Sequence, residues 1–141
     1  MDKVPKEPRS VLQHRRFFGL VRALFHHWPE AEDFQPDNEE HLRAYLLVKA
    51  GYRSVKTFYP DIKGVSADFA KMLPIVSAMM LSRYCWAWAD GDAVKVCAPE
   101  SIAFEKLPHK KACQVLNDVE EFIRTLGIEP DEVLNQTERA A

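Results

Sequence analysis

The sequence predicts a single α+β domain, mainly helical, with a small antiparallel β-hairpin packed against the helices. Several segments carry apolar residues at helical spacing, and two apolar runs flank Asp90-Gly91-Asp92. The 141-residue chain, 47% hydrophobic, is long enough for one packed core and too short for two full-sized domains. We therefore expect residues 10–138 to form one globular domain, preceded by a flexible arm at residues 1–9 with two prolines and mixed charges.

The first helix is expected from about Ser10 to Trp28, where Pro29 ends it. Its apolar positions follow the helical repeat and are Phe17, Phe18, Val21, Leu24, Phe25 and Trp28. Residues 30–36 form an acidic loop bounded by prolines. These apolar side chains are expected to line one wall of the core.

A second helix is expected to begin after Asp37 or Asn38, either of which can cap it, and to end at Gly51. Glu39 and Glu40 occupy its first turn, where the helix dipole favours acidic side chains. Residues 52–59 then alternate weakly in polarity, which favours a strand.

Residues 66–73 and 74–82 are both expected to be helical, with Pro74 at the first turn of the second piece. Residues 84–98 are expected to form the hairpin, and a continuous helix over residues 74–89 is the competing interpretation. A three-residue loop at 90–92 would place Cys85 opposite Cys97, whereas a two-residue loop shifts the pairing by one. The sequence leaves both registers open.

The clearest predicted element begins after Pro108 and ends before Gly127. Its apolar stripe consists of Ala112, Val115, Leu116, Val119, Phe122, Ile123 and Leu126. This stripe would either close the core or build a homodimer interface. A short helix from Pro130 to about Thr137 is expected to complete the fold.

The formal net charge of −2 conceals blocks of alternating sign. Residues 1–28 carry six bases and two acids, whereas residues 29–43 carry one base and six acids. Residues 44–113 are again basic and residues 114–141 acidic. A chain of nearly neutral charge can therefore still present a basic face to nucleic acid or an acidic face to a protein.

The first helix supplies the candidate nucleic-acid site, made of Arg9, Arg15, Arg16, Arg22 and His26. Arg15, Arg22 and His26 fall on one stripe opposite the apolar face, and Arg16 lies beside it. Arginine can engage phosphate oxygens through two parallel hydrogen bonds, which suits a phosphate-facing surface. The competing interpretation is an amphipathic helix whose basic groups are only solvated.

Trp86 and Trp88 would lie on one face of a strand, where they could stack on unpaired bases beside Lys95, although burial in the core is the simpler interpretation. No catalytic motif is present, so we expect a non-enzymatic protein without cofactor or metal. A minor hypothesis, a Mg²⁺-dependent nuclease, would use Asp61, Asp68, Asp90 and Asp92. The three cysteines have no paired spacing and are expected to be reduced.

Three segments of the chain resemble a family of small phage-encoded proteins of unassigned function. They are HRRFFGLVRALFHHW at 14–28, LLVKAGY at 46–52, and APESIAFEKL at 98–107, whose signature residues are Pro99, Ser101, Ile102, Phe104, Lys106 and Leu107. That family is similar to the NinB (Orf) recombination mediators of lambdoid phages, small dimeric proteins that bind DNA and assist recombinase loading. The resemblance covers roughly residues 9–58 and 93–126, treats residues 64–83 as an insertion, and matches Arg15 and Arg16.

The functional expectation is a non-catalytic phage accessory protein that binds nucleic acid and assists recombination. Single- or double-stranded DNA is a candidate partner, and the sequence leaves DNA and RNA both open. The alternative is a protein-binding phage inhibitor of a host defence or replication complex, acting through the acidic surfaces at residues 30–40 and the C-terminal segment. Without an apolar signal segment or an apolar run long enough to span a bilayer, the chain is expected in the host cytoplasm with no membrane partner.

Overall fold

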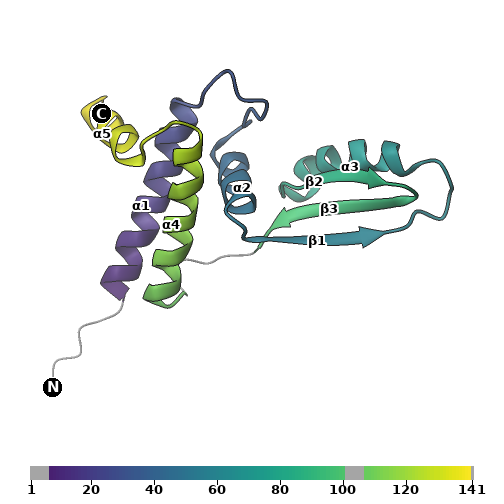
Figure 1. Cartoon of the computed structure of the whole chain (residues 1–141), viewed down its shortest axis with the longest axis horizontal. Coiled ribbons are helices and arrows are strands. Elements are labelled where there is room, and N and C mark those ends of the chain that lie inside the picture. Colours follow the sequence, from purple (N-terminus) through teal and green to yellow (C-terminus); the bar gives the residue numbers. More distant parts are fainter. Residues whose placement is uncertain (1–6, 101–106, 141) are drawn as a thin grey trace.

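The computed structural model describes residues 7–100 and 107–140, in which five helices and a three-stranded antiparallel sheet confirm the α+β class. The structure has two lobes (Figure 1). The helical lobe contains α1 (Glu7–His26), α2 (Glu39–Lys49), α4 (His109–Thr125) and α5 (Pro130–Ala140). The sheet lobe contains β1 (Arg53–Phe58), α3 (Ser66–Leu81), β2 (Trp86–Asp90) and β3 (Ala93–Pro99). It projects sideways from α2.

The main core lies in the helical lobe, where α1 packs against α2, α4 and α5. The predicted stripe of the 109–126 helix is buried there, so α4 closes this core. Phe122 and Leu126 pack at its margin. The largest side chains with no exposed surface include Phe17, Leu20, Leu24, Leu42, Leu46, Leu47 and Ile123.

The helix ends follow local chemistry. The side chain of Asn38 accepts a hydrogen bond from the backbone N–H of His41 (2.8 Å) and so caps α2. Gly51 follows the end of α2 with φ +102°, a backbone conformation that glycine adopts without strain. α1 begins at Glu7, three residues earlier than expected, because Pro8 is compatible with the first turn of a helix. The remaining arm residues, 1–6, lie outside the described chain.

The sheet has the order β1-β3-β2. Asp90 pairs with Ala93 across a two-residue loop, Gly91-Asp92, and Trp86 therefore pairs with Cys97. Of the two registers that the sequence left open, the two-residue loop is correct, with Gly91 at the first central position and φ +62°. The competing helix over residues 74–89 is excluded because α3 ends at Leu81.

The two helices expected at residues 66–73 and 74–82 are one helix, α3, with Pro74 in its interior. Proline removes the hydrogen bond that its own N–H would donate to Ala70, which usually kinks or ends a helix. α3 nevertheless packs against β2 and β3, and this packing opposes a break. The expectation of a helix start at Pro74 is therefore wrong.

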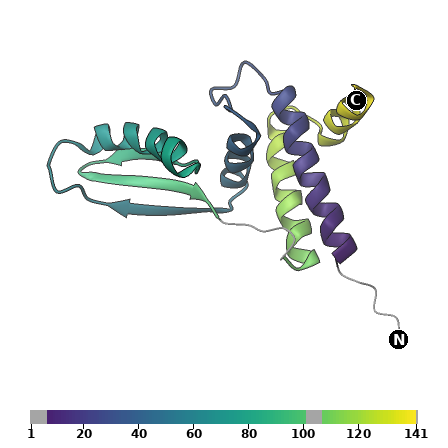
Figure 2. The same cartoon turned by 180° about the vertical axis from the view of Figure 1, so that it is seen from behind.

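α3 runs along the sheet, whereas α2 stands at the end of the sheet next to the helical lobe (Figure 2). One face carries the row Phe58–Val94–Ala89, and the Phe58 ring contacts Phe69 of α3. The other face carries the row Val55–Cys97–Trp86, and Trp86 contacts Tyr45 of α2. The sheet lobe is thus attached to the helical lobe through α2.

Candidate interaction surface

α3 turns its small residues toward the sheet. Ser66 and Ala70 are the buried residues of this helix, and Ser77 is half-buried. The hydroxyl of Ser66 donates a hydrogen bond to the carbonyl of Gly91 (2.7 Å), which ties the start of α3 to the hairpin loop. Ser77 donates to the carbonyl of Arg83 (3.0 Å) just beyond the other end. Small side chains let α3 lie close to β2, which is rich in alanine.

Most of the large residues of α3 are exposed to solvent. Met72, Met79 and Met80 are 58%, 79% and 78% exposed. At 100° per residue, the large exposed apolar positions of α3 other than Leu81, its last residue, fall within an arc of about 140°. They are Phe69, Met72, Ile75, Val76, Met79 and Met80. After Lys71, α3 has no charged residue on any side. A helix that is apolar on all sides is normally buried, so this part of α3 lacks a covering surface in the isolated chain.

The apolar surface continues onto β1 and the loop after it. All six residues of β1 are exposed. Phe58 lies on the face of the sheet that α3 covers and Val55 on the opposite face, so exposed apolar side chains occupy both sides of this edge strand. Together with Tyr59 and Ile62 and the six α3 residues of the arc, they define what we term the α3–β1 surface. Monomeric proteins seldom expose a contiguous apolar area larger than about 300–600 Å² without a functional reason.

β1 is also a free edge of the sheet. It pairs with β3 on one side only, and the backbone N–H of Glu100 donates to the carbonyl of Tyr52 (2.9 Å) just before it. Backbone groups of alternate residues point to opposite sides of a strand. Those of Arg53, Val55 and Thr57 therefore point away from β3, toward the open edge. An exposed edge of this kind is a template for strand pairing.

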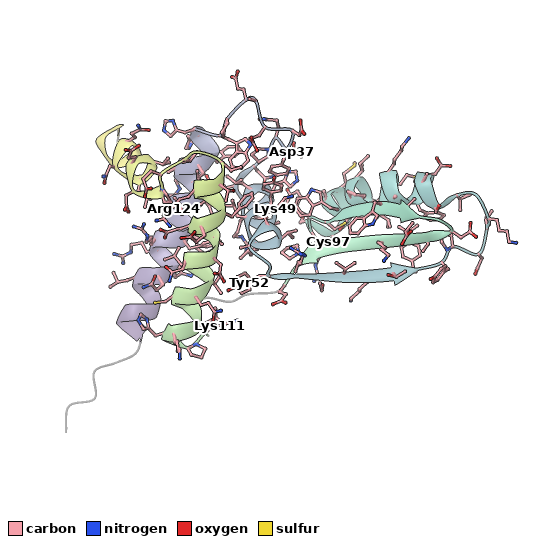
Figure 3. All side chains as sticks on the ribbon, viewed as in Figure 1. Asp37, Lys49, Tyr52, Cys97, Lys111 and Arg124 are labelled. Carbon is pink, nitrogen blue, oxygen red and sulfur yellow. The ribbon has the colours of Figure 1, made fainter. Side chains whose placement is uncertain are left out.

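An aromatic cluster lies at the joint between the lobes. His41 of α2 stacks on Tyr84 (centroids 4.5 Å apart) and on Trp86 (5.9 Å). The amide of Asn38 donates to the hydroxyl of Tyr84 (2.7 Å). Phe34 stacks on Tyr45 at 3.8 Å. The crowding of side chains at this joint, near the labels Asp37 and Lys49, is visible in Figure 3.

His41 is held neutral in this cluster. Desolvation by burial lowers the pKa of His41, and the negative charge of Asp37 only partly opposes this effect. The Nδ1 atom of His41 accepts a hydrogen bond from the backbone N–H of Asp37 (3.1 Å), which requires an unprotonated nitrogen. The joint is therefore best formed when His41 carries no charge.

Arg16, one of the predicted nucleic-acid residues, is engaged inside the protein. Its guanidinium donates to both carboxylate oxygens of Glu120 (2.9 and 3.1 Å) and to Asp131 (2.8 Å). The hydrogen bonds with Glu120 are the main cause of a raised pKa for Arg16. Glu120 is almost fully buried, so Arg16 neutralises a core charge and joins α1 to α4 and α5.

The other predicted residues remain on the surface of α1. Arg15 and His26 are exposed, and Arg22 lies 3.7 Å from the carboxylate of Glu39. Arg9 belongs to α1, but its side chain is outside the described part. Gly19, in the middle of the same stripe, faces Leu134 of α5. The element that lies close to the backbone at Gly19 is therefore the neighbouring helix α5.

The two tryptophans of the hairpin lie on one face, as predicted, but in different surroundings. Trp86 is half-buried in the aromatic cluster, which supports the core interpretation for this residue. Trp88 is 45% exposed and lies in the row with Lys95 and Thr57. Lys95 forms an ion pair with Asp90 (3.5 Å).

The residue types that could support metal or thiol chemistry do not converge. Over residues 7–100 and 107–140, no three histidine, cysteine, aspartate or glutamate side chains lie close enough to share a metal ion. The three cysteines carry free thiols, and burial raises the pKa of Cys85, which disfavours its reactive thiolate form. The acidic loop borders a shallow pocket that includes Glu32, Asp33 and Tyr45.

Comparison of the chain with protein families, with curated proteins and with solved structures finds no match. None of the described helices has the length and apolarity that crossing a bilayer requires. Of the phage-family signature, residues 101–106 lie outside the described chain, and Pro99 is the last residue of β3.

Sequence reasoning missed the α3–β1 surface, although a signal for it exists. No charged residue occurs between Lys71 and Arg83, over more than two helical turns. A helix at the surface of a monomer would show charged residues on its outer face over this length. The sequence could therefore have indicated that the outer face of this helix, like its inner face, is an apolar contact surface.

Proposed function

We propose that this protein is a non-catalytic interaction module that binds another protein surface through the α3–β1 surface. The observation that carries the proposal is the uncharged stripe of α3, whose large side chains face solvent while its small ones face the sheet. Methionine side chains, three of which lie in this stripe, are flexible and adapt well to a binding partner. The free edge of β1 adds backbone groups that can pair with a strand.

The test compares Met79→Glu/Met80→Glu with the wild type by light scattering after size-exclusion chromatography, both purified and in cell extract. We expect a wild-type species larger than the 16.2 kDa monomer and its loss in the double variant. Leu12→Glu is the matched control, because Leu12 is 58% exposed on α1 in the other lobe. A wild-type protein that remains monomeric in both settings would overturn the proposal.

A second function, DNA binding by a phage accessory protein that assists recombination, is supported by the exposed stripe of α1. Arg15, Arg22 and His26 lie seven and four residues apart on one exposed side of this helix. The resemblance to the phage family points in the same direction. Ion pairs within the protein weigh against DNA binding. Arg16 is paired with Glu120 and Asp131, and Arg22 lies close to Glu39, so two of the predicted cations already have acidic partners.

Fluorescence anisotropy with labelled single-stranded and duplex DNA at two salt concentrations tests this second function. Binding that weakens with salt and is reduced by Arg15→Gln/Arg22→Gln, but not by Lys63→Gln in the sheet lobe, would support it. Absence of binding at low salt would exclude it. Arg16 is unsuitable as a test residue because its loss would disturb the core.

A further inference from the structure

We propose that the occupant of the α3–β1 surface is a second copy of this chain, joined about a two-fold axis by antiparallel pairing of β1 with β1 of the partner copy. This inference rests on the proposed interaction function and adds the identity of the partner. The axis passes beside Thr57, so that Thr57 of one copy lies opposite Thr57 of the other. The pairing extends the sheet from three strands to six.

The area of the surface is sufficient for a stable dimer. A fully exposed large side chain presents roughly 150–250 Å². At the fractions exposed here, from 37% for Phe58 to 79% for Met79, the ten residues of the α3–β1 surface present on the order of 1,000 Å² per copy. A standard stable interface buries about 800 Å² on each partner.

The composition of the surface favours a permanent partner over a transient one. Transient interfaces are about as polar as the rest of a protein surface, whereas homodimer interfaces are more apolar and poor in charge at their centre. Within α3 no charged residue follows Lys71, and the exposed positions from Met72 to Leu81 are all apolar. This part of α3 resembles half of a core, as obligate interfaces do.

The chemistry along β1 is self-complementary in this register. Opposite residues have numbers that add to twice 57, so within β1 Lys56 faces Phe58 of the partner copy. Val55 would face Tyr59 and Arg53 would face Asp61, two residues that follow β1 and would join the pairing in the dimer. A β-branched residue opposite an aromatic one and a base opposite an acid are favourable cross-strand pairs. A register centred on Lys56 would instead place two lysines opposite each other, which is unfavourable.

The backbone geometry agrees with this register. Arg53, Val55 and Thr57 have the backbone groups that point away from β3, so Thr57 can exchange two hydrogen bonds with its counterpart. α3 packs over β2 and β3, and its Phe69 reaches toward Phe58 on β1. The apolar stripes of the two α3 helices would therefore face each other across the paired β1 strands. In Figure 1, which draws one copy, β1 forms the lower edge of the sheet.

Cross-linking of single-cysteine additions tests the register. Thr57→Cys is expected to form a covalent dimer under mild oxidation, because opposed residues in a hydrogen-bonded pair have Cα atoms about 5.5 Å apart, within disulfide range. Val55→Cys/Cys97→Ala is the matched control, since its two added thiols would lie about 13 Å apart along the strands. Replacing Cys97, which lies opposite Val55, prevents a disulfide within one chain. Wild type treated in the same way shows the background from the three native cysteines.

Analytical ultracentrifugation of the purified chain tests whether the partner is a second copy of this chain. We expect a dimer at micromolar concentration, a dimerisation constant at least tenfold weaker for Met79→Glu/Met80→Glu, and a few-fold weaker for Arg53→Glu. Combining Arg53→Glu with Asp61→Arg restores opposite charges in both symmetric pairs and should recover the affinity.

A purified chain that stays monomeric, or a dimer in which Val55→Cys/Cys97→Ala cross-links and Thr57→Cys does not, would overturn this inference. If the purified chain is monomeric but forms a larger species in extract that Met79→Glu/Met80→Glu abolishes, the second-copy inference fails while the interaction function stands. If neither sample contains a larger species, both fail.

Discussion

In the helical lobe the largest side chains lie inside, whereas in the sheet lobe many of them lie outside. Phe17, Leu20 and Leu24 of α1 have no exposed surface, while Met72 and Met79 of α3 are more than half exposed. Of the fourteen exposed large hydrophobic residues among those described, twelve belong to the sheet lobe or the loop within it. The two lobes contain similar residues, so the difference lies in what covers them.

The number of covering elements explains this difference. In the helical lobe α1, α2, α4 and α5 surround a common core, and each apolar stripe finds a partner. In the sheet lobe a single helix of about 10 Å diameter covers strands spaced about 4.8 Å apart, which is enough for two strands. α3 covers β2 and β3, and β1 is left open.

Truncating one large side chain in each lobe should give the largest contrast. Leu24→Ala should lower the free energy of unfolding by about 2–5 kcal/mol, because it leaves a cavity in the packed core. Met79→Ala should change the stability of the monomer by less than about 0.5 kcal/mol, because the side chain is exposed. Urea denaturation at low protein concentration measures both. An equally large loss for Met79→Ala in the monomer would show that α3 is covered from within the chain.

Removing the charge of Arg16 should destabilise the helical lobe by roughly 2–3 kcal/mol. Arg16→Met keeps the aliphatic stem but leaves Glu120 as a buried charge without its main partner. The loss falls below that of a fully buried pair because Arg16 retains about one third of its exposure. Arg15→Met, one position along on the exposed side, is the control. Equal effects of the two substitutions in thermal denaturation would contradict the structural role assigned to Arg16.

The joint between the lobes should weaken at acidic pH. Since the pKa of His41 is lower in the folded protein, the unfolded chain binds a proton first as the pH falls below about 6.5. Stability should therefore decrease below that pH, with a slope below about 1.4 kcal/mol per pH unit for this one group. In His41→Phe, which retains an aromatic ring, this contribution disappears from denaturation curves between pH 7 and 5. A pH dependence unchanged by that substitution would contradict a role for His41.

The smallest expected effect is a gain in stability in the helical lobe. Gly19→Ala should stabilise the protein by about 0.5–1 kcal/mol, because alanine favours the helix and its Cβ would lie 3.7 Å from Leu134, an ordinary contact. Gly51→Ala should have the opposite sign, because φ is +102° there. The melting temperatures of the two variants check this pair. A loss of stability in Gly19→Ala would mean that α5 packs more tightly against α1 than described.

Local patterns in the sequence predict most of the elements. The cap at Asn38, the end of α2 before Gly51, the strand before Tyr59 and the buried stripe of α4 are all found in the structure. These features depend on residues within one or two turns of each other, so that spacing and capping chemistry suffice to predict them. The α+β class follows from the same local signals.

The candidate surface and the fate of the charged residues depend on contacts between distant segments. Arg16 has the same local pattern as Arg15, yet its partner Glu120 is 104 residues away in the chain. The hairpin register likewise follows from the positive φ of Gly91, which the sequence Asp90-Gly91-Asp92 permits but does not require.

The sequence by itself determined where helices and strands form, because backbone preference and apolar periodicity act over a few residues. Only the tertiary structure decided which apolar stripe is covered and which faces solvent. The stripe of α4 finds α1 and α2, whereas that of α3 finds a sheet on one side and solvent on the other. Burial is a property of the elements that meet, and the periodicity of a single segment carries no information about its neighbours.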